Sequence, residues 1–242
     1  MRFDIANLSE NTPSTNKGIH RWLAVGGGRM SSSFGRPRLS RKLRIGLVID
    51  PTADLPGARA EGDAIHKILK AMDGSVQPQV LGAGESPATL QNVTDLLRQV
   101  DVLHYCGHAF FSDDDRSQSG LMLANNETLT SKQLEAITPI PRVVIFNACQ
   151  AGRVRGQQAS TRHQSFSLAE MVLRGGVEAF LGTFWEVNDA AAEMFASKLY
   201  TQLSSGLSLR ESVTLARIEL ENNNQSDWAN YCLYGDGRFQ LA

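Results

Sequence analysis

Two short apolar runs, each followed by a reactive side chain, organise the hydrophobic pattern of this chain. The first run, Val102-Leu103-His104-Tyr105-Cys106-Gly107-His108, ends in His108, and the second, from Arg142 to Gly152, carries Cys149. Both runs are rich in β-branched and aromatic residues and give way to small or polar ones, which is typical of buried strands in a parallel sheet. In such sheets, chemistry collects just beyond the carboxyl ends of neighbouring strands. We therefore expect His108 and Cys149 to share one cleft and to act as a catalytic dyad.

The residues before His108 alternate between strand and helix patterns. A strand is predicted over 43–49, and apolar positions within 58–72 recur at helical spacing. A short strand at 80–81 and a second helix over 90–100 lead into the His-bearing strand. This order predicts an α/β fold with a mainly parallel central sheet, flanked by helices and joined by right-handed crossovers.

The residues after His108 continue the mixed pattern. A small hairpin over 121–126 and a short helix near 131–136 precede the Cys-bearing strand, and a polar loop over 153–166 follows it. The remaining predicted elements are a helix over 168–173, a strand over 177–182, helices over 189–203 and 208–220, and a final strand over 228–233.

Composition and charge exclude several classes of protein. The chain has 242 residues, 42% of them apolar and 20% charged, which suits one large domain with a buried core. Its net charge of −1 offers no general attraction to nucleic acid or to a membrane surface. No apolar run has the length of a transmembrane helix, and the amino terminus lacks a signal-peptide core. The three cysteines are too scattered for a disulfide framework or a zinc ribbon. We expect a cytoplasmic protein in a reducing compartment, with no cofactor and no metal.

The amino-terminal segment differs from the rest. Residues 1–41 show no sustained period and are rich in Ser, Asn, Gly and Arg. They are predicted to form an extension or linker, partly ordered around Trp22, before a domain that spans 42–242. Residues 29–44 hold six basic side chains and no acidic one. This run is either a basic arm for nucleic acid or a solvated linker ending at a charged strand edge, and we favour the linker.

Cys149 has two interpretations. Free cysteine is among the most buried residue types, so an inert core thiol is the plain one. The small neighbours Ala148, Ala151 and Gly152 would instead leave the sulfur accessible and let a substrate backbone approach. Backbone amides after the strand could also form a nest that stabilises a thiolate or an oxyanion. We favour the catalytic interpretation.

His108 has three interpretations. A satisfied core histidine is the common case. However, His108 lies at a strand end before a polar loop, 41 positions ahead of Cys149, which favours catalysis. Strand parity also places His104, Cys106 and His108 on one side, which would suit a metal ion. Carboxylate support and recognisable ligand spacing are missing from this part of the sequence, so we do not favour the metal.

The blocks that surround these residues resemble a known family, the CHAT domains. These are caspase-like, clan CD cysteine peptidases, related to separase, caspases and metacaspases and often attached to tetratricopeptide repeats. The resemblance covers about four-fifths of the chain, from Leu43 to Gly235, with the blocks in family order. The matching blocks are Asp54-Leu55-Pro56-Gly57-Ala58 with Glu61, Leu103-His104-Tyr105 with Gly107-His108, Asn147-Ala148-Cys149 with Gly152, Ser167-Leu168-Ala169 with Gly175-Gly176, Trp185-Glu186-Val187-Asn188-Asp189, and Trp228-Ala229 with Gly235.

The resemblance implies a caspase-like three-layer sandwich that hydrolyses peptide bonds. Cys149 would attack the scissile carbonyl, His108 would protonate the departing amine, and water would hydrolyse the thioester. The backbone amides of Cys149 and Ala109 would hold the oxyanion. Many relatives have Gly where this chain has Ala109, which questions the geometry of the loop more than its ability to donate.

Three acidic residues are candidates for substrate binding. In separase-like relatives, an acidic residue at the position of Asp189 receives a basic side chain before the scissile bond, as a pocket carboxylate would. The alternative is that Asp189 caps the helix that begins there. Asp50 and Asp54 follow the first strand, where the clan also builds specificity. A pocket for arginine would make Arg153, Arg155 and Arg162 a self-cleavage segment; an ordinary solvated loop is the interpretation that we favour.

Two functions from different classes follow. The first is a cysteine endopeptidase that cleaves a protein substrate, after a basic residue, with a separate activating or recruiting protein as a further partner; bacterial relatives often serve defence or programmed cell death. The second is a catalytically idle module that keeps the CHAT fold for protein interaction. Retention of both His108 and Cys149 favours the enzyme. A metal-dependent hydrolase is a distant third interpretation.

Overall fold

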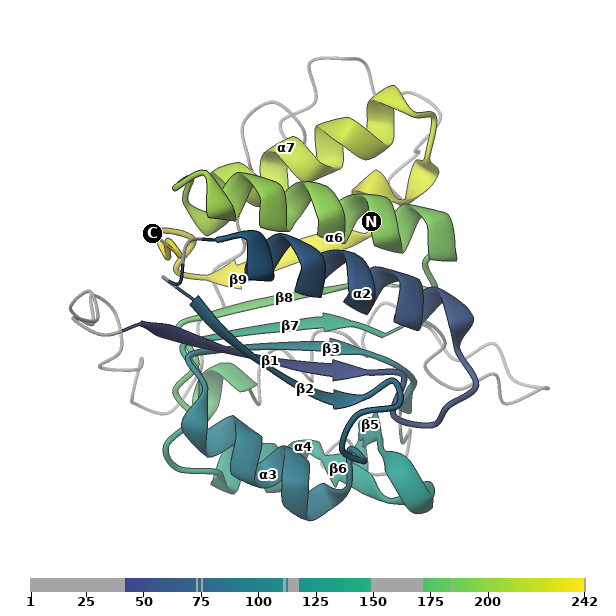
Figure 1. The fold of residues 1–242 in the computed structure, drawn as a ribbon, viewed down its shortest axis with the longest axis vertical. Coiled ribbons are helices and arrows are strands. Elements are labelled where there is room, and N and C mark those ends of the chain that lie inside the picture. The colour runs from purple at the N-terminus through teal and green to yellow at the C-terminus, as the bar shows by residue number, and fades with distance from the viewer. Residues whose placement is uncertain are drawn as a thin grey trace.

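A six-stranded sheet forms the centre of the protein. The computed structural model describes residues 42–72, 74, 76–110, 112, 118–148, 172–183 and 185–241. The strand order is β2-β1-β3-β7-β8-β9, and neighbouring strands are parallel except for the antiparallel pair β8 and β9 (Figure 1). The strands are β1 (Leu43–Ile49), β2 (Val76–Gly82), β3 (Val102–Cys106), β7 (Val143–Asn147), β8 (Ala179–Thr183) and β9 (Tyr231–Gly235). The predicted mainly parallel sheet is confirmed.

Helices cover both faces of this sheet, so the fold has three layers (Figure 1). On one face α6 packs between α2 and α7. On the other face lie α3, α4 and a small antiparallel sheet of order β4-β5-β6. These elements are α2 (Pro56–Ala71), α3 (Leu90–Gln99), α4 (Ser131–Ala136), α6 (Asp189–Ser204), α7 (Leu209–Asn222), β4 (Ala109–Phe110), β5 (Gly120–Met122) and β6 (Thr128–Thr130), with short 3-10 turns η3 (Ala124–Asn126) and η5 (Ser226–Ala229).

The apolar core has two halves, one on each face of the sheet. Successive side chains of a strand point to opposite faces. In β7, Val143 and Ile145 therefore join the core under α2, α6 and α7, whereas Val144 and Phe146 join the core above α3 and α4. Because both faces are covered, these strands are apolar along their whole length instead of alternating. This is the pattern that marked them in the sequence.

Individual residues determine where the helices begin and how closely α2 packs on the sheet. Pro56 stands in the first turn of α2, where its missing N–H costs no hydrogen bond. At α7, Ser208 and Glu211 form a reciprocal capping box. Gly62 lets α2 lie close on β1, because a Cβ there would come within 2.4 Å of the Ile49 side chain.

Two predicted strands needed revision. Only residues 80–81 were expected to be extended, yet β2 runs over seven residues. Pro78 is accommodated because β2 is an edge strand, where a missing donor can face away from β1. The last strand was expected to begin at Trp228, but Trp228 lies in η5 and β9 begins at Tyr231. The loop predicted over 153–166 lies outside the described residues, as does most of the helix predicted over 168–173.

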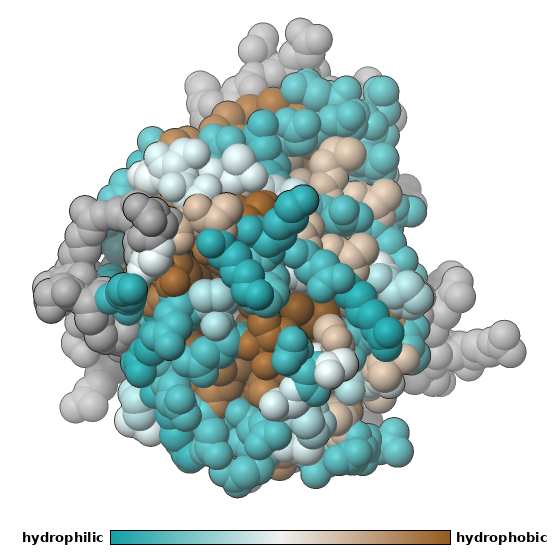
Figure 2. Space-filling model, in the orientation of Figure 1, coloured by the Kyte–Doolittle hydropathy of each residue, from teal (hydrophilic) through white to brown (hydrophobic). Residues whose placement is uncertain are grey.

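The surface seen in Figure 2 is mostly hydrophilic, with apolar side chains visible near its centre, where the sheet edge with β2 lies between the helical layers. The burial pattern of β2 agrees, since four of its residues in a row are only partly buried. Among the described residues, no helix is both long and apolar enough to cross a membrane.

Candidate active site

Four neighbouring parallel strands place the candidate residues at one edge of the sheet, the edge formed by the carboxyl ends of the strands. β1, β3, β7 and β8 lie side by side, so their carboxyl ends meet there. The segments that leave these strands carry the residues singled out in the sequence: Asp50 and Asp54 after β1, His108 and Ala109 after β3, Cys149 after β7, and Asp189 after β8. This is the place where parallel α/β sheets collect chemistry.

Cys149 lies outside the described residues, as do Arg153, Arg155 and Arg162. The strand that leads to Cys149 is described up to Ala148. β3 and β7 pair in parallel with Cys106 opposite Asn147, so the sequence places His108 and Cys149 each two residues beyond that pair. The expectation that the His-bearing and Cys-bearing strands are neighbours is confirmed; the geometry of the dyad itself stays a prediction.

The backbone of His108 is fixed by a buried tyrosine. The hydroxyl of Tyr105 lies 2.6 Å from the carbonyl oxygen of His108 and 2.7 Å from that of Met122. The Met122 amide also donates to the His108 carbonyl, at 2.9 Å. Burial raises the pKa of Tyr105 well above its ordinary value, so the hydroxyl keeps its proton and can donate. The imidazole therefore starts from a rigid anchor, and its side chain is 17% exposed.

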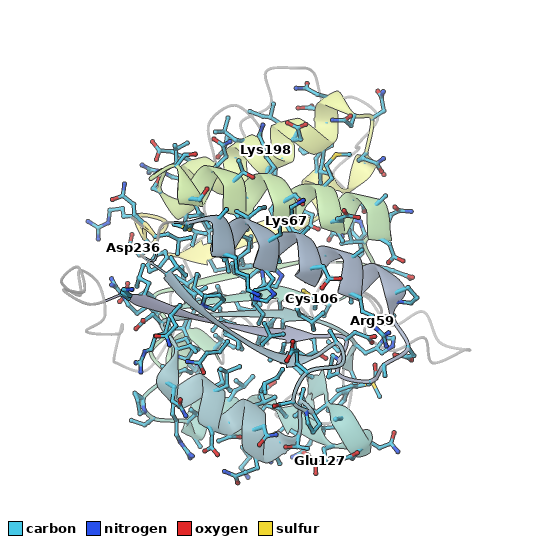
Figure 3. All side chains as sticks on the ribbon, viewed as in Figure 1. Arg59, Lys67, Cys106, Glu127, Lys198 and Asp236 are labelled. Atoms are coloured by element: carbon cyan, nitrogen blue, oxygen red, sulfur yellow. The ribbon has the colours of Figure 1, made fainter. Side chains whose placement is uncertain are left out.

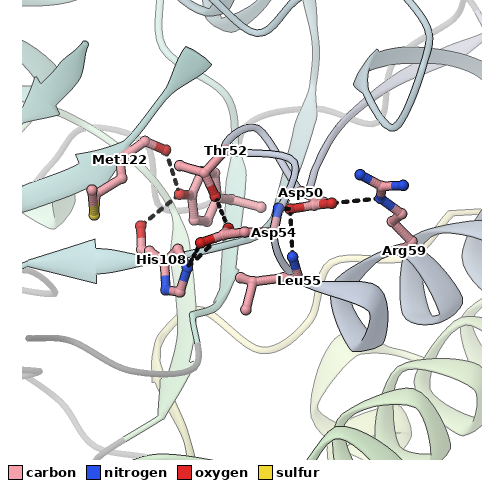
Figure 4. Close-up of polar contacts among 8 residues, drawn as sticks. Asp50, Thr52, Asp54, Leu55, Arg59, His108 and Met122 are labelled. Atoms are coloured by element: carbon pink, nitrogen blue, oxygen red, sulfur yellow. Dashed lines mark hydrogen bonds and ion pairs between the residues drawn. The ribbon is translucent and has the colours of Figure 1, made fainter. Parts of the chain in front are cut away.

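Asp54 faces the imidazole of His108. Nε2 of His108 lies 3.1 Å from Oδ1 and 3.2 Å from Oδ2 of Asp54 (Figure 4). The Thr52 hydroxyl donates to Oδ1 of Asp54 at 2.5 Å. The hydrogen bond from Thr52 is the largest cause that holds the pKa of the Asp54 carboxyl below its ordinary value; burial opposes it, and the contact with His108 lowers the pKa further. Asp54 is therefore an ionised carboxylate beside His108 at neutral pH.

Asp50 holds the loop that carries Asp54. Its side chain is buried, and Oδ1 accepts the backbone amides of Asp54 and Leu55, each at 3.0 Å. Its other oxygen pairs with Nε of Arg59 (Figure 4). Asp50 itself has a φ of 40°, in the left-handed region, so the chain turns sharply as it leaves β1. These bonds engage the Asp50 carboxylate inside the loop; its predicted part in substrate binding stays a prediction.

Asp189 is exposed and lies against the first turn of α2. Asn188, not Asp189, caps α6, because its Oδ1 accepts the Ala190 amide at 2.9 Å. The carboxylate of Asp189 packs over Gly57, where an added Cβ would lie 2.2 Å from the Asp189 Cγ. The positive end of the α2 dipole favours a negative charge at this place. Asp189 therefore lies beside the segment that also carries Asp54.

A buried asparagine anchors the segment between β8 and α6. The side chain of Asn230 is fully buried; its Oδ1 accepts the Trp185 amide at 2.9 Å and its Nδ2 donates to the Trp185 carbonyl at 2.8 Å. The Trp185 side chain, 40% exposed, is the exposed large hydrophobic group found in the described ranges. The anchor fixes where this segment crosses the edge of the sheet, and with it the start of α6.

Ala109 opens β4, where it pairs with Leu121 of β5. The Met122 amide bonds to the carbonyl of His108, one pair further along the same ladder. Because hydrogen-bonded and non-bonded pairs alternate in an antiparallel ladder, the Ala109 amide points away from β5. That orientation is compatible with the predicted oxyanion role, which stays a prediction.

A second cluster of polar side chains is buried beneath this edge. The sequence did not predict that these residues contact one another. Glu61 of α2 and His104 of β3 form a pair, with 2.9 Å between Oε1 and Nε2, and both side chains are buried. Nδ1 of His104 lies 3.1 Å from the Tyr200 hydroxyl, and the Asn147 amide donates to Oε1 of Glu61 at 2.8 Å. Glu61 is 43 residues from His104, so only its place in the family blocks could have drawn attention to it.

The same group bears on the metal question. Glu61, His104 and Cys106 offer ligand atoms within 4.8 Å of one another, and Cys106, the last residue of β3, lies on the α2 side of the core (Figure 3). Glu61 supplies the carboxylate that the neighbouring sequence lacked. However, both ring nitrogens of His104 and Oε1 of Glu61 already make hydrogen bonds, and a metal ion would have to replace them. The group satisfies itself as a buried hydrogen-bond network.

Solved structures with a similar fold are cysteine peptidases of the caspase-like class. The Saccharomyces cerevisiae separase–securin complex matches 82% of this chain with a TM-score of 0.52 and 17% identity, over 12% of the matched chain. The Arg specific cysteine proteinase gingipain R matches 81% with a TM-score of 0.56 and 12% identity, over 47% of its own chain. A further structure, of a protease, matches 87% with a TM-score of 0.58 and 13% identity, over 51% of that chain. This chain thus spans about half or less of each, and the likeness concerns the fold.

The chain belongs to the CHAT domain family, whose sequence profile matches residues 8–236. The predicted family and its caspase-like fold are confirmed. The match begins within residues 1–41, and the domain boundary at residue 42 stays a prediction. None of the curated proteins matches the sequence.

Proposed function

We propose that this CHAT protein is a cysteine endopeptidase, with Cys149 as the nucleophile and His108 as the general acid and base. The observation that carries the proposal is the parallel pairing of β3 with β7, Cys106 opposite Asn147, which brings the exits of these two strands together. His108 also has the partial exposure that proton transfer to a substrate requires. Membership of a family with a peptidase fold supports the same reaction.

In the proposed reaction, the Cys149 thiolate attacks the scissile carbonyl and forms a tetrahedral intermediate. The amides of Ala109 and Cys149 hold its oxyanion, and protonated His108 donates to the leaving amine. His108 then takes a proton from water, which attacks the thioester and releases the acid product, returning Cys149 as thiolate and His108 in its protonated form. The chain needs no cofactor for these steps.

We further propose that the substrate carries a basic residue before the scissile bond. Asp189 is an exposed carboxylate beside the segment that holds Asp54 and, through it, His108. A guanidinium or ammonium group would pair with such a carboxylate. The Arg specificity in the name of gingipain R, a structure of similar fold, agrees with this preference. The separase structure is a complex with a second protein, which favours a protein partner for this chain as well.

Cleavage of a peptide library tests both parts. Wild type should cleave after Arg or Lys, Cys149→Ala should not cleave, and Asp189→Ala should lose the basic preference while still cleaving. Glu193→Ala, which removes another exposed carboxylate of α6, is the matched control and should behave as wild type. Cleavage that persists in Cys149→Ala would refute the assignment, and cleavage lost only with a chelator would indicate the metal-dependent hydrolase instead.

The alternative is an idle module that keeps the fold for protein interaction. A thiol-reactive probe built on a basic peptide separates it from the enzyme, because labelling of Cys149 should depend on His108. If wild type neither cleaves nor labels, and adding candidate partner proteins changes neither result, the idle module is the better account.

A further inference from the structure

We propose that Asp54 is a positioning residue that fixes the orientation and tautomer of His108, the proposed general acid and base. The inference rests on the proposed function, because it assigns a role to the group that acts on His108. It also gives Asp54 a different part from the substrate-binding one that the sequence indicated.

The first observation is the contact itself. Both oxygens of Asp54 lie within 3.2 Å of Nε2 of His108, so this nitrogen faces the carboxylate squarely (Figure 4). An ionised carboxylate accepts hydrogen bonds and cannot donate them. Nε2 therefore carries a proton in the neutral ring, and Nδ1 is left with the lone pair. Asp54 thereby selects which nitrogen of His108 exchanges protons with thiol and substrate.

The second observation is that Asp54 is itself held from two sides. The Thr52 hydroxyl donates to its carboxylate, and the buried Asp50 carboxylate accepts its backbone amide at 3.0 Å. Asp50 is fixed in turn by Arg59. His108 is held at its backbone by Tyr105. Each partner is thus anchored independently of the contact between them, as a positioning pair requires.

The third observation concerns charge. When Cys149 ionises, His108 carries the proton, and a carboxylate beside Nε2 stabilises that imidazolium. Other titratable groups that contact this pair include the Asp50 carboxylate, which is paired with Arg59 and accepts the Asp54 amide, and the Tyr105 hydroxyl, 2.6 Å from the His108 carbonyl oxygen. Asp54 is 60% exposed, so water weakens its effect relative to a buried carboxylate. We expect a loss below the about 10⁴-fold known for the buried carboxylate of a Ser-His-Asp triad.

The test compares wild type with Asp54→Asn, Asp54→Glu and Thr52→Val. Asp54→Asn should lower kcat by about 10- to 100-fold, by analogy with partners that orient a metal-bound histidine, while KM stays within about twofold. Asp54→Glu should recover part of kcat, and Thr52→Val should cause a smaller loss in the same direction. Asp63→Asn, an exposed aspartate of α2, is the matched control.

A second readout does not depend on activity. Ring ¹⁵N signals of His108, assigned with His108→Gln, should show the Nε2–H tautomer in wild type and a mixed or reversed tautomer in Asp54→Asn. If that change occurs in a protein that cleaves nothing, the positioning role stands and the proposed function fails. An unchanged tautomer in a folded Asp54→Asn protein would overturn the inference. A raised KM with unchanged kcat would return Asp54 to substrate binding.

Discussion

His104 and His108 lie four residues apart, yet their surroundings differ. His104 lies within β3 with 1% of its side chain exposed, and both ring nitrogens are engaged by Glu61 and Tyr200. His108 lies past the end of the strand with 17% exposed, and its described ring contact is made by one nitrogen, to an exposed carboxylate. A buried histidine with both ring nitrogens hydrogen-bonded suits a structural role. A partly exposed histidine with one ring nitrogen held by a carboxylate suits proton transfer.

The two sites also differ in how their partners are held. The group around His104 joins α2, β3, β7 and α6 across the core, so it ties layers together. The group around His108 joins two loops at the edge of the sheet and rests on short local bonds from Thr52 and Asp50. Loss of the group around His104 should therefore lower the free energy of unfolding, and loss of the group around His108 should lower catalytic activity. The predictions below test this division.

The largest expected effect is on catalysis by His108→Ala. Removal of a general acid and base costs about 10²- to 10⁴-fold in rate, so kcat should fall in that range. Because the side chain is partly exposed and packs on a loop, the free energy of unfolding should change by less than about 1 kcal/mol. Rate assays and urea denaturation measure the two quantities. Equal losses of rate and stability would contradict the division.

His104→Ala should show the reverse. The substitution removes one hydrogen-bond partner from each of the buried side chains Glu61 and Tyr200, and it opens a cavity under α2. We expect a loss of about 3 to 5 kcal/mol in the free energy of unfolding. Urea denaturation measures this, with His66→Ala, a partly buried histidine of α2, as the control. A His104→Ala protein as stable as the control would remove the structural role.

Gly57→Ala sharpens the comparison at the edge of the sheet. The new Cβ would press on the Asp189 carboxylate, so overpacking should cost about 1 to 3 kcal/mol, partly offset by the better helix propensity of Ala. The basic preference should weaken because Asp189 must move. Combining Gly57→Ala with Asp189→Ala should relieve the stability cost, and a double-mutant cycle measures the coupling. Additive effects would mean that the two residues do not press on each other.

The smallest expected effect is on the free energy of unfolding at acidic pH. Since the pKa of Asp54 is lowered in the folded protein, its contribution is present above its unfolded value, about 4, and is lost as pH falls through the folded value. The free energy of unfolding of wild type should therefore approach that of Asp54→Asn as pH falls below about 4. Unfolding curves of both proteins at several pH values measure the gap. A gap that does not change with pH would show that the carboxylate contributes nothing through its charge.

Much of the fold and part of the candidate site could be predicted from the sequence. Strands buried on both faces have continuous apolar runs, so β1 was predicted with its observed bounds, and β3 and β7 lie within the two runs that carry His108 and Cys149. The helix predicted near 131–136 has the same bounds in the structure. Thr130 and Gln133 form a capping box, whose spacing of three residues is visible in the sequence. β2 was harder to predict, since a partly exposed edge strand with a proline has a mixed pattern. The start of β9 was misplaced because Trp228 is apolar but lies in a 3-10 turn.

Local patterns along the chain were enough to predict the order of strands and helices, the two reactive residues that follow two of the strands, and the family. These depend on local periodicity and on motifs, which neighbouring residues carry. Folding brings together side chains that these patterns do not connect: Asp54 with His108, Glu61 with His104 and Asn147, and Asp189 with Gly57. Each of these pairs joins residues far apart in the chain, and the register of the sheet and the packing of helices set their distances. A pattern of neighbours cannot encode such a distance, so the contacts of Asp54 and His104 are visible only in the folded chain.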